Sequence, residues 1–118
     1  MKNKKPKRIK ESSDLPTPIA AYFMADMGDS ETLSRCFTDD AVVKDEGQTH
    51  KGRAAIKRWK TEVSSKYKYA SEPLLCEQKD GKTVVTCRLA GNFPGSPVDL
   101  RFFFEVRGEK IAFLEIIP

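Results

Sequence analysis

The sequence Val-Asp-Leu-Arg-Phe-Phe-Phe-Glu-Val, residues 98–106, decides the fold class of this chain. Every even-numbered position holds an aliphatic or aromatic side chain. The odd-numbered positions hold Asp99, Arg101, Phe103 and Glu105. Because successive side chains of a strand point to opposite faces of a sheet, this alternation predicts a strand that covers a hydrophobic core with one of its faces.

Further strands are predicted around this segment. Together with it they span residues 67–78, 82–91, 98–106 and 110–117. The first two flank Asp80-Gly81, a strong β-hairpin signal, and a loop of helix and strand breakers, residues 92–97, follows them. The second half of the chain therefore reads as an antiparallel meander.

The last predicted hairpin has two possible registers. A two-residue turn would place Glu115 opposite Phe102, which buries a lone carboxylate among aromatic rings at a high cost in free energy. A three-residue turn at residues 107–109 pairs Glu115 with Arg101, a mildly favourable cross-strand pair. We therefore predict the three-residue turn, with Ala112, Leu114 and Ile116 facing inward.

The same register predicts an apolar patch on the outer face of the sheet. Phe103 would lie opposite Phe113, with Ile111 and Ile117 nearby. Such a patch on an outer sheet face suggests a protein interface. We expect a homodimer through this face.

Helices are predicted in the first half of the chain. The segment Leu15-Pro16-Thr17-Pro18 opens the first helix, and Gly28 ends it. Asp29 is an N-cap for a short second helix that runs to Phe37. The third helix spans residues 53–65. Its apolar stripe is Ile56, Trp59 and Val63, and the side chains expected to face water are Lys57, Arg58, Lys60 and Glu62.

A short strand, residues 41–45, lies between the second and third helices, followed by a turn with a short partner strand at residues 47–51. Helices followed by a meander of strands indicate an α+β fold. We predict one domain over residues 15–118.

Charge is concentrated at the start of the chain. The net charge is +4, but residues 1–10 hold five Lys and one Arg, and the remainder has 15 basic and 17 acidic residues. Residues 1–14 are therefore predicted to be a basic, disordered tail, and the folded part lacks the positive face of a nucleic-acid binder. No signal-peptide core or membrane-spanning run follows, so a cytoplasmic protein without membrane partners is expected.

The cysteines and the single histidine argue against a metal site. Cys36, Cys76 and Cys87 lack metal-ligand spacing. Cys76 is expected opposite Val85, so that Cys87 lies diagonally from it and beyond disulfide reach. We expect three buried thiols, no metal and no cofactor.

Two segments are similar to the signature of the nuclear transport factor 2-like (SnoaL-like) family. They are Phe37–Gly47 and Gly52–Trp59, and the resemblance extends from Leu15 to Pro118. It implies a cone-shaped fold, in which a strongly curved sheet is wrapped by three helices, and often a homodimer through the outer sheet face. Family members include ketosteroid isomerase, scytalone dehydratase, polyketide cyclases and non-catalytic binding domains, so the fold does not transfer a function.

Three residues are candidates for acid/base chemistry. Strand alternation turns Asp45 toward the pocket with Val43, and its position resembles that of the aspartate that moves the substrate proton in ketosteroid isomerases. Tyr22 resembles the helix-borne tyrosine of those enzymes, although it lies one residue out of register. His50 could assist Asp45 as an acid or base. The second acid of the isomerases is missing, because Phe102 occupies its position and Asp99 faces outward.

The sequence therefore predicts a pocket for a small apolar ligand, with Asp45 as its main polar group. The expected wall is Phe23, Trp59, Leu100, Phe102, Phe104 and Leu114. Asp45 would either transfer a proton on a carbonyl-bearing substrate, as in an isomerase, cyclase or dehydratase, or only orient the ligand. The alternative is a non-catalytic dimeric module whose cavity is filled by side chains.

Overall fold

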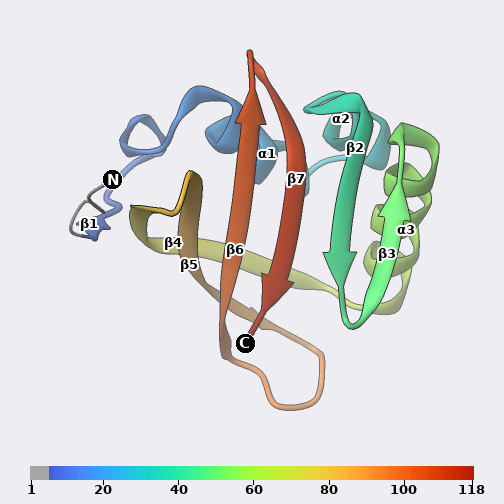
Figure 1. Ribbon diagram of the computed structural model, residues 1–118. Helices are drawn as coiled ribbons and strands as arrows, with labels where there is room; N and C mark the ends of the chain where they lie inside the picture. Colours follow the sequence, from blue (N-terminus) through green and yellow to red (C-terminus); the bar gives the residue numbers. More distant parts are fainter. Residues whose placement is uncertain (1–5) are drawn as a thin grey trace.

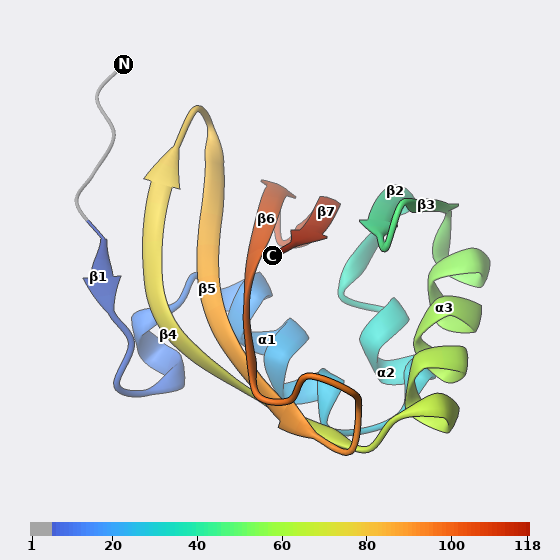
Figure 2. The same ribbon diagram turned by 90° about the horizontal axis from the view of Figure 1, so that it is seen from below.

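The computed structural model describes residues 6–118, and it confirms the predicted α+β fold (Figure 1). One sheet has the strand order β1-β4-β5-β6-β7-β2-β3, and the pair β2–β7 is parallel whereas all other neighbours are antiparallel. The strands are Lys7–Arg8 (β1), Phe37–Asp45 (β2), Gln48–Lys51 (β3), Tyr69–Lys79 (β4), Lys82–Gly91 (β5), Val98–Arg107 (β6) and Lys110–Ile117 (β7). The sheet curves strongly, and the helices lie on its concave side (Figure 2).

The helices begin where their capping residues predict. Helix α1 spans Thr17–Asp26 with Pro18 in its first turn, where the missing N–H has no intrahelical partner to lose. Helix α2 spans Ser30–Ser34, and Asp29 accepts a hydrogen bond from the backbone N–H of Thr32 at 2.7 Å. This helix stops earlier than predicted, because β2 already begins at Phe37.

Helix α3, Arg53–Lys66, follows Gly52, whose φ of +85° lies in a region that favours glycine. Its Ile56 and Trp59 are buried, as its apolar stripe predicts. Lys60 was expected to face water, and this was wrong, because its side chain is only 3% exposed. It lies one turn after Ile56, on the face that packs against the rest of the protein, and it has a buried acidic partner described below.

The predicted register of the last hairpin is wrong. The structure has a two-residue turn in which Arg107 pairs with Lys110, followed by a β-bulge. Beyond the bulge Phe103 pairs with Glu115, and Phe113 pairs with Glu105, so neither predicted cross-strand pair forms. The extra residue in β7 lets the core accept more apolar surface than a regular strand would allow.

Ile111 shows this most clearly. We predicted it on the outer face, but it is fully buried, as is Leu114 three positions later. In a regular strand these two side chains would point to opposite faces. The bulge turns both inward, and the backbone N–H of Ile111 donates to the carbonyl of Cys36 at 2.9 Å. Burial of a further isoleucine outweighs the loss of the predicted salt bridge.

Two short elements lie within the segment that was predicted to be a basic tail, residues 1–14. Lys7 and Arg8 form β1 against β4, and Ser12–Asp14 form a 3-10 turn. Asp14 accepts hydrogen bonds from the backbone N–H groups of Lys10 and Glu11 at 2.8 and 3.2 Å. Strand β4 is otherwise a sheet edge, and an edge offers free backbone groups to any segment nearby. Residues 1–5 of the predicted tail lie outside the described residues.

The core lies between the helices and the concave sheet face. Helix α1 contributes Ile19, Tyr22 and Phe23, and the rings of Tyr22 and Phe23 lie at centroid distances of 5.4–6.3 Å from those of Phe102 and Phe104 in β6. Mutual edge contacts of this kind stabilise a core beyond the area they bury.

Within residues 6–118, no helix has the length and apolarity needed to cross a membrane.

Candidate functional site

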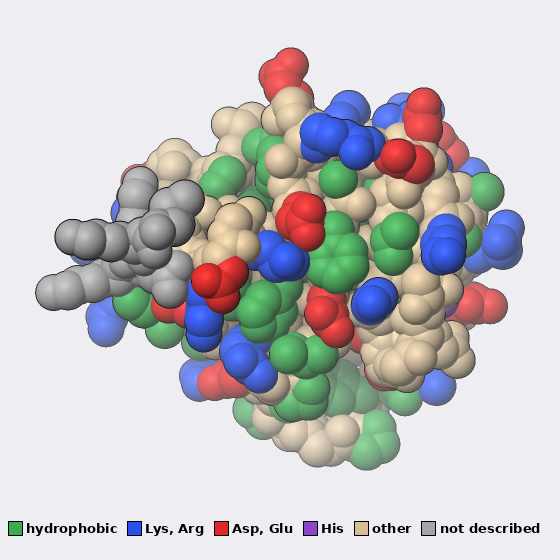
Figure 3. Space-filling view, viewed as in Figure 1, with side chains coloured by type: hydrophobic (Ala, Val, Ile, Leu, Met, Phe, Trp, Pro, Cys, Tyr) green, Lys and Arg blue, Asp and Glu red, His purple; other side chains and the backbone are tan. Residues whose placement is uncertain are grey.

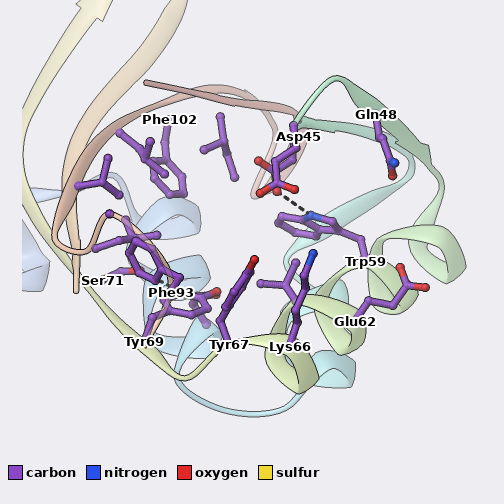
Figure 4. A pocket seen from close by; sticks show the side chains of 18 of the residues that line it. Asp45, Gln48, Trp59, Glu62, Lys66, Tyr67, Tyr69, Ser71, Phe93 and Phe102 are labelled. Carbon is purple, nitrogen blue, oxygen red and sulfur yellow. Dashed lines mark hydrogen bonds between the residues drawn. The ribbon is translucent and has the colours of Figure 1, made fainter. Parts of the chain in front are cut away.

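An open cavity of about 610 Å³ lies between the concave sheet, α3 and the loop before β6 (Figure 4). Its volume suits a small organic molecule. The wall contains six aromatic residues, Tyr22, Trp59, Tyr67, Tyr69, Phe93 and Phe102, with Val63, Leu89, Leu100 and Ile116 between them. Polar side chains interrupt this wall near Asp45, near Asp26 and on α3, where Glu62 and Lys66 also line the cavity.

Asp45 ends β2 and contributes its carboxylate to the cavity wall. Strand alternation places it on the same face as Val43, which is fully buried. Trp59 of α3 donates its indole N–H to Asp45 Oδ2 at 3.0 Å, and Figure 4 shows this bond on one side of the cavity. The carboxylate is thus held in one orientation beside open volume.

The pKa of Asp45 is raised from its ordinary value, and burial is the main cause. The neighbouring charge of Glu46 acts in the same direction, whereas the hydrogen bond from Trp59 and the proximity of His50 act against it. A carboxyl group with a raised pKa exchanges its proton more readily near neutrality. The site therefore supplies a group that can both accept and return a proton.

His50 also contributes to the cavity wall, from β3 and not from a turn. It pairs with Val43 across the β2–β3 hairpin, and its ring lies 6.0 Å from that of Trp59 at an angle of 35°. Trp59 therefore has Asp45 at its indole nitrogen and His50 beside its ring. The structure brings the predicted acid, histidine and tryptophan together in one wall.

Tyr22 lies on α1 with a side chain that is almost wholly buried and lines the cavity. Its hydroxyl has no hydrogen-bond partner in residues 6–118, yet every fully buried side-chain nitrogen or oxygen in that range has one. The hydroxyl must therefore reach the open volume of the cavity. Burial, reinforced by the charge of Asp26, raises the pKa of Tyr22 and keeps this hydroxyl protonated.

The predicted apolar wall divides into two groups. Trp59, Leu100 and Phe102 line the cavity. Phe23, Phe104 and Leu114 lie in the hydrophobic core, where α1 packs on β6 and β7. These six residues were predicted to line the cavity because they lie on the inward faces of their strands and helices. An inward-facing side chain reaches the cavity only where no helix covers it.

A second polar cluster was missed by sequence reasoning. It consists of Asp26, Lys60, Tyr69 and Ser71, which come from α1, α3 and β4. Lys60 Nζ lies 2.6 Å from Asp26 Oδ1, and their side chains are 3% and 7% exposed. Tyr69 and Ser71 donate to the Asp26 carboxylate at 3.3 and 3.2 Å. One signal existed in the sequence, since Asp26 lies four residues after Tyr22 and therefore on the same helix face.

No group of three or more His, Cys, Asp or Glu side chains within residues 6–118 could hold a metal ion. Cys76 lies opposite Val85, as predicted, and all three cysteines are free thiols.

Comparison with known proteins agrees with this geometry. The family model described as SnoaL-like domain matches residues 20–114. A crystal structure from Sinorhizobium meliloti, of a protein proposed to be a polyketide cyclase, is 42% identical with a TM-score of 0.84 and covers 90% of this chain and 98% of its own. No significant match was found among curated proteins.

Two more distant structures share the fold. A hypothetical protein with a ketosteroid isomerase-like fold from Catenulispora acidiphila, solved in complex with trimethylamine, is 20% identical with a TM-score of 0.78 and covers 87% of this chain and 85% of its own. A further protein proposed to be a polyketide cyclase, from Xanthomonas campestris, is 16% identical with a TM-score of 0.73 and covers 89% and 87%. Since the family model spans most of the folded part, this chain belongs to the SnoaL-like domain family.

Proposed function

We propose that the cavity binds a small apolar molecule with a carbonyl group and that Asp45 transfers a proton on it, as an isomerase, cyclase or dehydratase requires. The single observation behind this proposal is the position of the Asp45 carboxyl group, which lies beside open volume with a raised pKa and a fixed orientation. The likeness to a protein proposed to be a polyketide cyclase, 42% identical, supports the same class of reaction.

The proposed step is an enolisation. A carboxylate oxygen of Asp45 takes a proton from the carbon next to the carbonyl, and the electron pair of that C–H bond moves to give an enolate. Asp45 then returns the proton to the same or another carbon. Alternatively the enolate attacks a second carbonyl of the same molecule, and the resulting alkoxide takes the proton back from Asp45. In a dehydration, a hydroxyl group on the next carbon leaves with that proton as water. No electrons leave the substrate, so the step needs no redox cofactor.

An enolate oxygen must be stabilised by a hydrogen-bond donor for this step to be fast. The Tyr22 hydroxyl is a candidate, because it is protonated, reaches the cavity and has no partner among residues 6–118. His50, which also lines the cavity, is a second candidate. A single donor of this kind typically contributes a rate factor on the order of 100–1000.

A test of this proposal does not require the natural substrate. Exchange of the protons next to the carbonyl of 2-tetralone for deuterium in D₂O can be followed by NMR against a buffer blank. We expect the wild type to accelerate exchange and Asp45→Asn to return it to the buffer rate. Glu109→Gln, which removes an exposed carboxylate in the β6–β7 turn, should leave the rate unchanged. Exchange by Asp45→Asn at the wild-type rate would refute proton transfer by this residue.

A second candidate function is a non-catalytic dimeric module, and the outer sheet face favours it (Figure 3). Strands β5, β6 and β7 place Val84, Phe103, Phe113 and Ile117 on that face, and the charged side chains of Arg101, Glu105 and Glu115 lie between them. Ile111 takes no part, since it is buried in the core. Such a face suits a homodimer. If this is the function, the protein should not accelerate deuterium exchange of 2-tetralone, whether or not it binds the compound.

A further inference from the structure

Within the cluster of Asp26, Lys60, Tyr69 and Ser71, the side chains of Tyr69 and Ser71 lie on the other side of the cavity from Asp45 and Trp59 (Figure 4), and Asp26 also lines the cavity. Tyr69 and Ser71 belong to β4, which is three strands away from β7, the neighbour of β2. A molecule that reaches Asp45 can therefore contact this cluster with its opposite end. The proposed function does not use these four residues.

The hydrogen-bond capacity of Lys60 is already filled. Its ammonium group donates to Asp26 Oδ1 at 2.6 Å, to the Asp26 backbone carbonyl at 2.9 Å and to the Tyr69 hydroxyl at 3.1 Å. An ammonium group has three N–H bonds, and all three have partners. Lys60 therefore has no hydrogen left for a ligand.

The two hydroxyl groups of the cluster have likewise used their hydrogens. Tyr69 donates to Asp26 Oδ1 at 3.3 Å, and Ser71 donates to Asp26 Oδ2 at 3.2 Å. Burial raises the pKa of Tyr69, with the charge of Asp26 as the second cause, so its hydroxyl keeps its proton. Each hydroxyl has one O–H hydrogen, so what remains is acceptor capacity on oxygen.

The two carboxylate oxygens of Asp26 accept different numbers of hydrogen bonds. Its Oδ1 receives hydrogen bonds from Lys60 and Tyr69, whereas Oδ2 receives one from Ser71. A carboxylate oxygen can accept two hydrogen bonds, so Oδ2 has room for another donor. Since Asp26 and Ser71 both line the cavity, this room faces the ligand.

We propose that Asp26 and Ser71, held in place by Lys60 and Tyr69, form a second binding point of the cavity that takes a hydroxyl group of the ligand. Every remaining hydrogen-bonding site in the cluster is an acceptor, so a carbonyl or a carboxylate would find no donor there. The Asp26–Lys60 pair has no net charge, which favours a neutral hydroxyl over a cation. The inference rests on the proposed function for the other end of the ligand, and it defines the substrate as a hydroxylated apolar carbonyl compound.

Two ligands that differ in one hydrogen-bond donor test the proposal. In 2,7-dihydroxynaphthalene both ends can donate, whereas in 7-methoxy-2-naphthol one hydroxyl is replaced by an ether that keeps the oxygen but not the hydrogen. We expect calorimetry to show that the wild type binds the dihydroxy compound roughly fivefold to tenfold more tightly, as one further hydrogen bond predicts. Equal affinities would overturn the proposal.

The variant that removes the binding point is Ser71→Val, because its methyl groups replace the hydroxyl and cover Asp26 Oδ2 while the Asp26–Lys60 pair stays intact. We expect this variant to bind both ligands with equal affinity. Thr86→Val is the matched control, since it makes the same kind of change on the outer face of the neighbouring strand β5, and it should keep the preference. A preference that persists in Ser71→Val would contradict the proposal.

A double variant, Asp26→Leu with Lys60→Met, gives an independent test in which no buried charge is left unpaired. It too should bind the two naphthalene compounds equally. The proposed reaction is examined separately through the deuterium exchange of 2-tetralone, which has no hydroxyl group. Exchange that depends on Asp45 together with no hydroxyl preference would refute the second binding point alone, and the reverse result would refute the reaction alone.

Discussion

The indole N–H of Trp59 donates to Asp45 Oδ2 at 3.0 Å, and Trp59 is the only tryptophan of the chain. Its fluorescence therefore reports on the candidate site without a label. As Asp45 takes up a proton, the charge next to the indole disappears, and the emission should change with an apparent pKa above the ordinary aspartate value of 3.8. A pH titration of fluorescence checks this. Asp45→Asn should abolish the transition and Glu109→Gln should keep it; an unchanged transition in Asp45→Asn would assign it to another group.

The raised pKa of Asp45 also predicts how stability depends on pH. Between the ordinary pKa and the raised pKa, the folded state binds more protons at this position than the unfolded state does. Ionisation of Asp45 therefore lowers the free energy of unfolding as the pH rises through this interval. Asp45→Asn, which keeps an acceptor for Trp59, should raise Tm by a few degrees at about pH 8 and by less at about pH 4.5. Thermal melts of the wild type and the variant at both pH values measure this. A Tm of Asp45→Asn below that of the wild type at the higher pH would contradict the prediction.

The buried pair of Lys60 and Asp26 predicts a large loss of stability when only one partner is removed. Lys60→Met leaves a carboxylate without its cation, and the expected loss is about 3–5 kcal/mol. For a domain of this size, this loss lowers Tm by roughly 10–20 °C. The double variant with Asp26→Leu should lose far less, because both charges are gone. Calorimetric melts of the single and double variants decide the matter.

An exposed ion pair supplies the control for that comparison. Arg88 and Asp99 lie across β5 and β6 with an N–O distance of 2.9 Å, but their side chains are 51% and 47% exposed. Removal of Arg88 by substitution with Ala should cost about 1 kcal/mol or less. If Arg88→Ala and Lys60→Met lowered Tm equally, burial of the Lys60 pair would have no special role.

Gly91 predicts a local steric effect at the end of β5. A Cβ atom at this position would lie 2.1 Å from the carbonyl oxygen of Lys68 and 2.7 Å from the Cα of Tyr69, so backbone would have to move. Gly91→Ala should destabilise the fold by about 1–3 kcal/mol. Gly28→Ala is the matched control, because its Cβ would meet only the carbonyl of Ala25 at 3.5 Å. Chemical denaturation of both variants measures the difference, and equal stabilities would contradict the strained contact.

The dimer proposal can be tested without loss of the fold. Phe113 has Lys44 and Lys82 within 6.0 and 5.8 Å of its ring centroid, so Phe113→Glu would place a carboxylate between two cations. We expect sedimentation analysis to find a dimer for the wild type and at least a tenfold weaker one for this variant. Met27→Glu, at a side chain 81% exposed and away from the sheet, should not change assembly. A monomeric wild type would end the proposal.

Periodicity predicted most of the fold because most side chains obey it. The alternation in residues 98–106 places Phe102 and Phe104 correctly in the core, and the helix stripe does the same for Ile56 and Trp59. Val106, predicted on the core face of the same strand, is instead 39% exposed. The bulge in β7 interrupts the two-residue alternation of side chains along the strand, so Ile111 was assigned to the wrong face. A rule that assumes a regular strand cannot anticipate where an inserted residue will add burial.

The candidate site was only half predictable for a related reason. Asp45 follows from its strand, and Trp59 follows from its helix, so each could be placed from its own element. Lys60 and Asp26 lie 34 positions apart, and each by itself has the character of a surface residue. Only the tertiary fold, which brings the last residue of α1 next to Lys60 of α3, pairs the two charges and makes their burial tolerable.

Strand β1 has a practical consequence for shortened forms of the protein. Lys7 pairs with Cys76 and Arg8 with Leu75, so two residues with cationic side chains occupy the hydrogen-bonding edge of β4. A chain that began at Leu15 would leave that edge open over an exposed leucine, and an open edge recruits other chains into intermolecular sheets. Aggregation in such a shortened protein would then reflect the loss of this cover and not a defect of the hydrophobic core.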